Sequence, residues 1–286
     1  MHFFDLPNEI IFLILAHLPL KSLLIFRSIS TQCVYLLNGA YYGLDSSRRE
    51  LLKLYLDAVS SPTYELSKSY MEHGDIDRNF DREACLERWI SNSKGVKPKG
   101  NPRIEFPTDF ATWISDWPEK GPFVWLWPAL KMNPDSVYFW RHPVFTASPT
   151  YLLPTNMKQA IVLLTFHETK VETPGMKTEL YCSMISNPPF NADGKPPIIA
   201  EEENQTYALP THIIRATLEC PTMRYRFLLF GGGGVTKNLR GHVVDMYSSS
   251  PELSQGTAKV VSRNWIEYMR WELRESEKKA HLMLSK

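Results

Sequence analysis

The chain has 286 residues, and its 32 Lys and Arg nearly balance its 31 Asp and Glu, for a formal net charge of +1. This balance argues against a protein that binds nucleic acid or an anionic membrane through bulk electrostatic attraction. Hydrophobic residues make up 43% of the chain, which is enough to bury a sizeable core and argues against wholesale disorder. The length fits one large domain, or a small module followed by a medium-sized one.

The cysteines and histidines show no pattern of a metal site. Cys33, Cys85, Cys182 and Cys220 are far apart and include no Cys-x-x-Cys pair, which rules out a zinc ribbon and argues against a disulfide framework. No histidine pair has metal-ligating spacing. The longest apolar run, Ile10 to Ala16, is too short to span a membrane, and nearby acidic residues argue against a signal peptide. We therefore expect an intracellular protein, cytoplasmic or nuclear, that contacts neither membrane nor nucleic acid.

The first forty residues predict three short helices. Their expected ranges are Leu6 to Leu18, Leu20 to Ile29, and Ser30 to about Tyr42. Asp5 is the expected N-cap of the first helix, Pro19 is expected to end it, and Ser30 to cap the third. Three such helices make a small core, so the surplus of apolar side chains suggests that the module completes its core against a partner.

The sequence is mixed from residue 46 to about residue 103. Helices are expected at Arg48–Val59 and Arg82–Ile90, with a polar stretch between them. A loop rich in Gly, Pro, Lys and Asn follows from Ser91 to Arg103. This loop is the best candidate for a domain boundary.

The remainder of the chain predicts a series of strands followed by a closing helix. The strand-like runs are Val144–Phe145, Ala160–Phe166, Glu179–Ile185, His212–Leu218, Tyr225–Phe230 and His242–Tyr247. The closing helix is expected from about Ser262 to Leu284. The fold class is therefore α+β: a small three-helix N-terminal module followed by a mixed helix and antiparallel-sheet domain.

Five short motifs occur in order near the start of the chain. They are Leu6-Pro7-Asn8-Glu9, Ile14-Leu15, Leu18-Pro19, Leu23-Leu24 and Arg27-Ser28-Ile29-Ser30. In this order and spacing they resemble the F-box family, over residues 3 to about 42. The main departure is Cys33, a position at which many F-boxes carry Trp.

The resemblance implies docking without catalysis. F-box modules bind a Skp-family adaptor, which links them to a cullin and to a RING subunit that recruits ubiquitin-conjugating enzyme. The adaptor-binding residues implied by the motif are Leu6, Pro7, Ile10, Ile14, Leu18, Pro19, Leu23 and Leu24. Burial of apolar surface would drive such binding. The alternative is that these residues only form helices that pack on the downstream domain.

A second resemblance concerns the C-terminal part of the chain. Phe106-Pro107-Thr108-Asp109-Phe110, then Trp113-Ile114, together with Asn264 to Met269, resemble parts of Smi/Knr-type domains of the SUKH superfamily. Such domains are α+β interaction modules and not enzymes. An unassigned α+β domain with an amphipathic last helix fits the same residues.

Two further features have simpler explanations than a functional site. Trp117, Trp125 and Trp127 are candidates for contacting a target, because aromatic side chains provide contact area at low entropic cost. Alternatively, together with Trp113, they fill a core. The run Gly231–Gly234 lacks the Gly-Lys-Ser/Thr spacing of a phosphate loop, so we expect a hairpin loop there.

The sequence predicts a binding protein and not an enzyme. It contains no Gly-x-Ser-x-Gly motif and no distinctive acid pair, so we expect no catalytic residues, no metal and no cofactor. The predicted function is substrate recognition in an SCF-type cullin–RING ubiquitin ligase: residues 1–45 bind the adaptor, 46–103 form a helical connector and loop, and 104–286 recruit a protein substrate. One alternative is a regulatory complex with the adaptor but without ubiquitination. Another is an enzyme whose site escapes motif search.

Overall fold

The structure is a computed structural model that describes residues 3–64, 80–93, 106–119, 121–123, 150–151, 161–168, 180–185, 206–219, 222–230, 240–248 and 256–284. The helices in these ranges are η1 (Phe3–Asp5), α1 (Asn8–His17), α2 (Leu20–Ile29), α3 (Thr31–Ala40), η2 (Tyr41–Gly43), α4 (Ser46–Ser60), α6 (Arg82–Ser93), α7 (Thr108–Asp116) and α10 (Trp265–Leu284). The strands are β1 (Thr150–Tyr151), β2 (Ile161–Glu168), β3 (Leu180–Ile185), β4 (Thr206–Glu219), β5 (Thr222–Leu229), β6 (Val243–Ser248) and β7 (Gly256–Ser262). None of the helices in these ranges combines the length and apolar character needed to cross a membrane.

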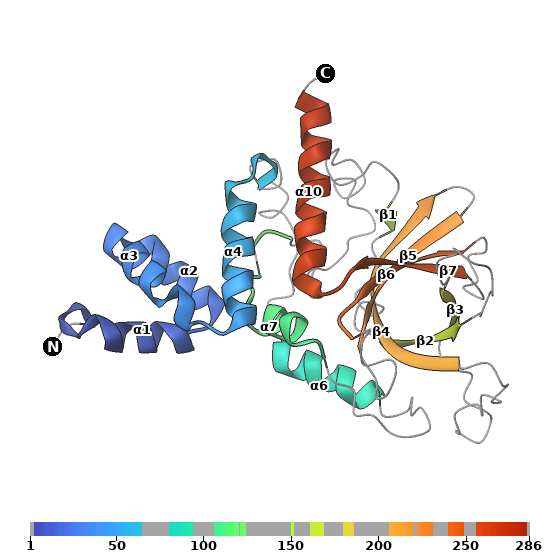
Figure 1. Ribbon diagram of the computed structural model, residues 1–286, viewed down its shortest axis with the longest axis horizontal. Coiled ribbons are helices and arrows are strands. Elements are labelled where there is room, and N and C mark those ends of the chain that lie inside the picture. Colours follow the sequence, from blue (N-terminus) through green and yellow to red (C-terminus); the bar gives the residue numbers. More distant parts are fainter. Residues whose placement is uncertain are drawn as a thin grey trace, which may run out of the picture.

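The elements are arranged in sequence from helices to sheet. Figure 1 shows α1, α2 and α3 grouped at one end of the molecule and the sheet at the other, with α4 and α10 between them. One cluster of buried apolar side chains runs through this arrangement, from Ile11 in α1 to Met269 in α10. The predicted α+β class, with a three-helix N-terminal module and an antiparallel sheet, is confirmed.

The first three helices lie close to where the sequence predicts them, with one difference at the start. Ser30 caps α3 as expected, because its Oγ accepts a hydrogen bond from the Cys33 N–H at 3.2 Å. Asp5 does not cap α1 and instead lies in the turn η1. Pro7 occupies the cap position, and its carbonyl accepts from the Ile10 and Ile11 N–H groups. The expectation that Asp5 caps α1 is wrong, because Asp5 is the last residue of η1 and Pro7, two residues later, is the residue that directly precedes the helix.

Six of the strands pair in a closed ring. Within the described residues the sheet order is β1-β4-β2-β3-β7-β6-β5, and β4 also pairs with β5, so that the ring closes on itself. All of the strand pairs are antiparallel. Strand β4 makes closure possible because its first half pairs with β2 and its second half with β5, with a register shift between Ile213 and Arg215. Such an irregularity bends a strand and increases its twist.

Five predicted strands correspond to observed ones with shifted ends. Ala160–Phe166, Glu179–Ile185, His212–Leu218, Tyr225–Phe230 and His242–Tyr247 match β2, β3, β4, β5 and β6. The predicted strand Val144–Phe145 lies outside the described residues. Strands β5 and β6, on either side of the glycine run, pair directly, and the Gly241 N–H bonds the Leu229 carbonyl. The predicted hairpin loop at Gly231–Gly234 itself lies outside the described residues. Gly241 has a φ of 83°, a conformation that favours glycine.

Side chains on both faces of β5 are buried. Phe227 and Leu229 are buried on one face, whereas Leu228 belongs to the cluster shared with the helices. Successive side chains of a strand alternate between faces, so the ring has an inner core as well as an outer core. On the outer face, Leu228 lies opposite Val243 in the register and Arg226 lies opposite Asp245.

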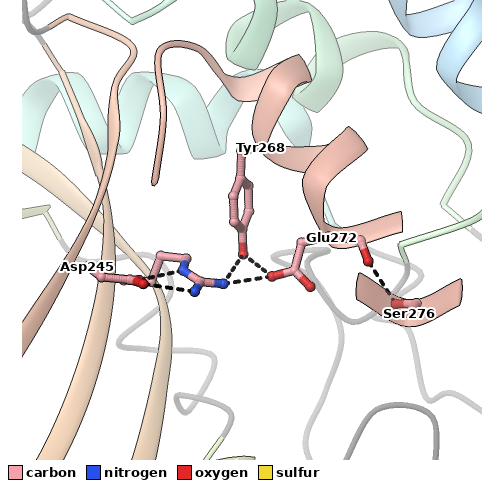
Figure 2. A network of polar contacts seen from close by, with 5 residues as sticks. Asp245, Tyr268, Glu272 and Ser276 are labelled. Carbon is pink, nitrogen blue, oxygen red and sulfur yellow. Dashed lines mark hydrogen bonds and ion pairs between the residues drawn. The ribbon is translucent and has the colours of Figure 1, made fainter. Parts of the chain in front are cut away.

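Arg226 is the centre of a buried ionic network that joins the sheet to α10. Its Nε and Nη2 bond the two carboxylate oxygens of Asp245 at 2.6 and 3.1 Å, and its Nη1 bonds Glu272 Oε1 at 3.0 Å. Figure 2 shows Asp245 on one side of the guanidinium, with Tyr268 and Glu272 on the other. Burial alone would lower the pKa of Arg226, but Tyr268, Asp245 and Glu272 raise it overall. The ring of Trp271 lies 4.5 Å from the guanidinium carbon.

The start of α10 is held by side chains from two elements. Asn264 Oδ1 accepts from the Glu267 N–H, while Asp109 Oδ2, from α7, accepts from the Trp265 N–H at 2.8 Å and the Ile266 N–H at 3.3 Å. The first N–H groups of a helix have no partner within the helix, so Asp109 supplies one from another part of the chain. Burial raises the pKa of Asp109, although the backbone hydrogen bonds oppose this.

An aromatic cluster surrounds this junction. The Trp265 ring centroid lies 5.0 Å from that of Phe110 and 4.9 Å from that of Trp113, and Phe110 also contacts Phe230. The cluster therefore packs α7, the end of β5 and the start of α10 together. Such pairs add about 0.5–1.5 kcal/mol each beyond the burial of their area.

Replacing Arg226 with Leu is expected to lower the free energy of unfolding by about 3–5 kcal/mol, because Asp245 and Glu272 would stay buried without their cation. Urea unfolding followed by tryptophan fluorescence measures this loss. Arg274→Leu, at an exposed position of α10, is the control and should change stability by no more than about 0.5 kcal/mol. A loss below about 1 kcal/mol for Arg226→Leu would contradict the role of the network.

The Asp109→Asn variant isolates the titration of the buried carboxyl, because asparagine retains an acceptor oxygen. A raised pKa means that the folded state binds the proton more tightly than the unfolded state. The stabilisation from Asp109 is therefore full below the ordinary aspartate pKa of about 3.9 and is lost as the pH rises through the raised value. The unfolding free energy of the wild type, minus that of Asp109→Asn, should fall with pH over this window. A difference that rises with pH would refute this sign.

Candidate functional site

The exposed apolar side chains are concentrated at the N-terminal end of the molecule. Side-chain exposure is described for residues 3–64, 80–87, 106–119, 121–123, 226–230, 240–245, 259–278 and 281, and among these every exposed large hydrophobic side chain except Val260 lies between Phe4 and Tyr42. Leu13 is 60% exposed, Ile29 66% and Tyr35 71%. We call this set of exposed side chains the apolar face; it consists of Phe4, Ile10, Leu13, Ile14, Ile25, Ile29, Tyr35 and Tyr42. A concentration of exposed apolar surface of this kind marks an interaction site.

The helices that carry the apolar face have a small core of their own. Ile11 and Leu15 of α1 are buried, together with side chains of α2 and α3. In α1 the exposed apolar residues lie beside these buried ones in the sequence, so the helix is apolar over most of its circumference. Gly39 of α3 allows α1 to approach closely, because a Cβ at that position would lie 2.5 Å from the Phe12 ring. A module this small does not bury all of its apolar residues.

The structure separates the predicted adaptor-binding residues into three groups. Pro7, Ile10, Ile14 and Pro19 are exposed, and Leu6, Leu18 and Leu24 are half-buried. Leu23 is fully buried in the core of the helices. The position of Leu23 on α2 turns its side chain towards the core, where it supports the fold, so its burial gives no support to the expected contact with a partner.

Sequence reasoning missed four exposed residues of the apolar face on α1 to α3. Leu13, Ile25, Ile29 and Tyr35 are not among the predicted adaptor-binding residues but are among the most exposed apolar side chains. A signal was present for three of them. Leu13 lies three residues after Ile10, and Ile25 and Ile29 are four residues apart, so each set shares one side of its helix.

Trp117 does not lie on an accessible surface. The side chain is 1% exposed, its Nε1 donates to the Pro122 carbonyl at 2.9 Å, and its ring packs against Tyr55 and Phe123. The Trp117 side chain is therefore part of the core, as is that of Trp113, and this burial gives no support to a contact between Trp117 and a target. The other two candidates, Trp125 and Trp127, lie outside the described residues.

Helix α4 connects the first three helices to the C-terminal part of the chain. Arg48 Nε bonds Asp116 Oδ2, at the end of α7, at 2.7 Å, and Glu50 pairs with Arg270 of α10. The hydrogen bond from Arg270 lowers the pKa of Glu50. Asp45 caps α4 by accepting from two backbone N–H groups. These contacts place α4 against both α7 and α10.

Within the described ranges, no arrangement of side chains supports a metal site or a role for a cysteine thiol in chemistry. There, no three side chains from His, Cys, Asp and Glu gather in a way that could hold a metal ion. Cys33 and Cys85 are buried free thiols, and a buried free cysteine packs as a small hydrophobic residue. The apolar face is therefore the feature that points to function.

Substitutions in α2 should separate residues that support the fold from residues that are free to bind. Leu23→Ala is expected to lower the free energy of unfolding by about 2–5 kcal/mol, because it leaves a cavity in a closed core. Ile25→Ala, at a largely exposed position on the same helix, should change it by no more than about 0.5 kcal/mol. Chemical unfolding of both variants tests this, and equal losses would contradict the placement of Leu23.

Comparison with known proteins identifies one region. Residues 3–38 match the F-box domain. No curated protein and no solved structure matches the chain. Nothing in these comparisons supports the Smi/Knr resemblance of the C-terminal part. F-box proteins are typically adaptors without catalytic activity. The helices that carry the apolar face are thus an F-box domain, which implies binding of a Skp-family adaptor.

Proposed function

We propose that this protein is the substrate-recognition subunit of an SCF-type cullin–RING ubiquitin ligase. The apolar face of α1 to α3 binds the Skp-family adaptor, and the part of the chain after residue 103 binds a protein target. The observation that carries the proposal concerns the residues whose side-chain exposure the structure describes: apart from Val260, their exposed large hydrophobic side chains all lie in or directly beside the F-box domain. This role places the protein inside the cell, in the cytoplasm or the nucleus.

Burial of the apolar face would provide the free energy of adaptor binding. Complete burial of one exposed Leu or Ile side chain contributes about 1.5–3 kcal/mol, and those of the apolar face are already partly buried. Burial of several such side chains together can contribute more free energy than association costs through lost translational and rotational freedom, which is about 4–15 kcal/mol. The face contains few charges, so the interaction does not require strong electrostatic attraction.

The contacts of α4 support a role in positioning a target. Because α4 packs against α7 and α10, the F-box domain and the sheet join through one buried cluster. A target bound to the C-terminal part would then be held at a set distance from the adaptor. In such a complex, proximity accelerates ubiquitin transfer, and the receptor itself needs no catalytic group.

The Ile10→Asp, Ile14→Asp double variant tests adaptor binding. Both positions are exposed, so the fold should be retained, but adaptor affinity should fall by at least about tenfold because two charges would have to be desolvated at the interface. The measurement is a pull-down with purified Skp-family adaptor, with circular dichroism as the check on folding. Val260→Asp, at an exposed apolar position far from the F-box, is the matched control and should bind normally.

Full adaptor affinity in the folded double variant would refute adaptor binding through the apolar face. The pull-down can be extended to a cullin to test the finer part of the proposal. Recovery of both adaptor and cullin by the wild type supports the ligase. Recovery of the adaptor without a cullin would favour the regulatory complex without ubiquitination.

A further inference from the structure

Helices α1 and α2, which carry most of the apolar face, pack on α3 more than on each other. Among the described elements, α1 packs mainly on α3 and η2, whereas α2 packs mainly on α3. Exposed side chains of the face belong to both outer helices: Ile10 and Ile14 to α1, and Ile25 and Ile29 to α2. An adaptor that contacts both sets must therefore match the distance and angle between two helices that have little direct packing between them.

The turn η1 joins these two outer helices. The Phe3 ring packs edge-on against the Phe26 ring of α2, with 5.9 Å between the ring centroids. Both side chains are half-buried and pack against the main apolar cluster. The Phe4 ring, which belongs to the apolar face, packs edge-on against Phe3 at 5.5 Å. The three rings thus connect η1 to α2.

The connection from η1 to α1 is short and stiff. Only Leu6 and Pro7 separate the turn from the helix. The proline ring fixes the φ angle of Pro7 and disfavours helical conformations of Leu6 before it. The Leu6 N–H also bonds the Phe3 carbonyl at 3.3 Å, and the Pro7 carbonyl accepts from the first turn of α1. A displacement of Phe3 is therefore passed on to this turn, which carries Ile10.

We infer that Phe3 is a positioning residue for adaptor binding, because its contact with Phe26 sets the start of α1 relative to α2. The inference rests on the proposed function and deepens it, by naming a residue that shapes the surface offered to the adaptor. Without the Phe3 ring the helices stay folded, but the first turn of α1 is free to move. Adaptor binding then includes the cost of ordering that turn, so affinity falls.

The Phe3→Ala variant tests this role through adaptor affinity, measured by titration calorimetry with the full chain and a purified Skp-family adaptor. Affinity should fall roughly two- to tenfold, which corresponds to the loss of one aromatic pair. Phe3→Tyr keeps the ring and should retain wild-type affinity. Phe106→Ala is the matched control, because Phe106 is also half-buried and packs edge-on against Phe230, outside the F-box. It should leave adaptor affinity unchanged.

Two further measurements separate positioning from direct contact with the adaptor. Because Phe3 acts through Phe26, the double variant Phe3→Ala, Phe26→Ala should bind no more weakly than the weaker of the two single variants. In the absence of adaptor, Phe3→Ala should speed hydrogen exchange of the Ile10 and Ile11 amides, which bond the Pro7 carbonyl. Exchange in α3 should stay unchanged.

Wild-type affinity of Phe3→Ala, additive losses in the double variant, or equally faster exchange in α3 each overturns the inference. An equal loss of affinity in Phe106→Ala also overturns it, because the loss would then reflect general stability. Failure of the wild type to bind the adaptor overturns the proposed function and the inference together. Binding by the wild type that Phe3→Ala leaves unchanged refutes the role of Phe3 alone.

Discussion

The structure depends on the burial of one arginine between two carboxylates on different elements. Asp245 comes from β6 and Glu272 from α10, so satisfying Arg226 requires the helix to lie across the sheet in one register. A buried cation is costly unless it is paired and hydrogen-bonded, and here four of its contacts are polar groups inside the core. The guanidinium carbon also lies over the ring of Trp271. The position of α10 is therefore set by ionic geometry as well as by apolar packing.

Fixing α10 also fixes the helices that contact it. Its first turn receives Asp109 from α7, and Arg270 further along pairs with Glu50 of α4. Arg48, in the first turn of α4, pairs with Asp116 at the end of α7. Exposed ion pairs such as Glu50–Arg270 contribute little individually, but α4, α7 and α10 also share one cluster of buried apolar side chains. The F-box domain thus continues into the rest of the chain through packed helices.

The sequence predicts local structure well where one segment determines its own conformation. The boundaries of α2 follow from Pro19 and Ser30, and the hairpin of β5 and β6 follows from glycines between two apolar runs. Strand β7 escaped prediction because Ser262 suits the start of a helix and the residues before it alternate only weakly. The first half of β4 escaped it because that half pairs with β2, some forty residues earlier. Pairings between distant segments leave little trace in local pattern.

The candidate site was predictable to a similar extent. The motif around Leu6 and Pro7 located the domain, but it could not distinguish Leu23, which is buried, from Ile25, which is exposed. Both are apolar residues of the same helix, and only the direction of the side chain separates them. The burial of Trp117 likewise depends on Tyr55 and Phe123, which the sequence does not place beside it.

The pairing of Glu50 with Arg270 has a consequence for biosynthesis. The two residues are 220 positions apart, so one side of α4 stays uncovered on the ribosome until α10 has been translated. Domains generally fold in the order of their synthesis, but this connection closes only with a late segment. Nascent chains thus display the F-box helices before the C-terminal part of the chain is complete. Early capture by the adaptor would shield the apolar face during that interval.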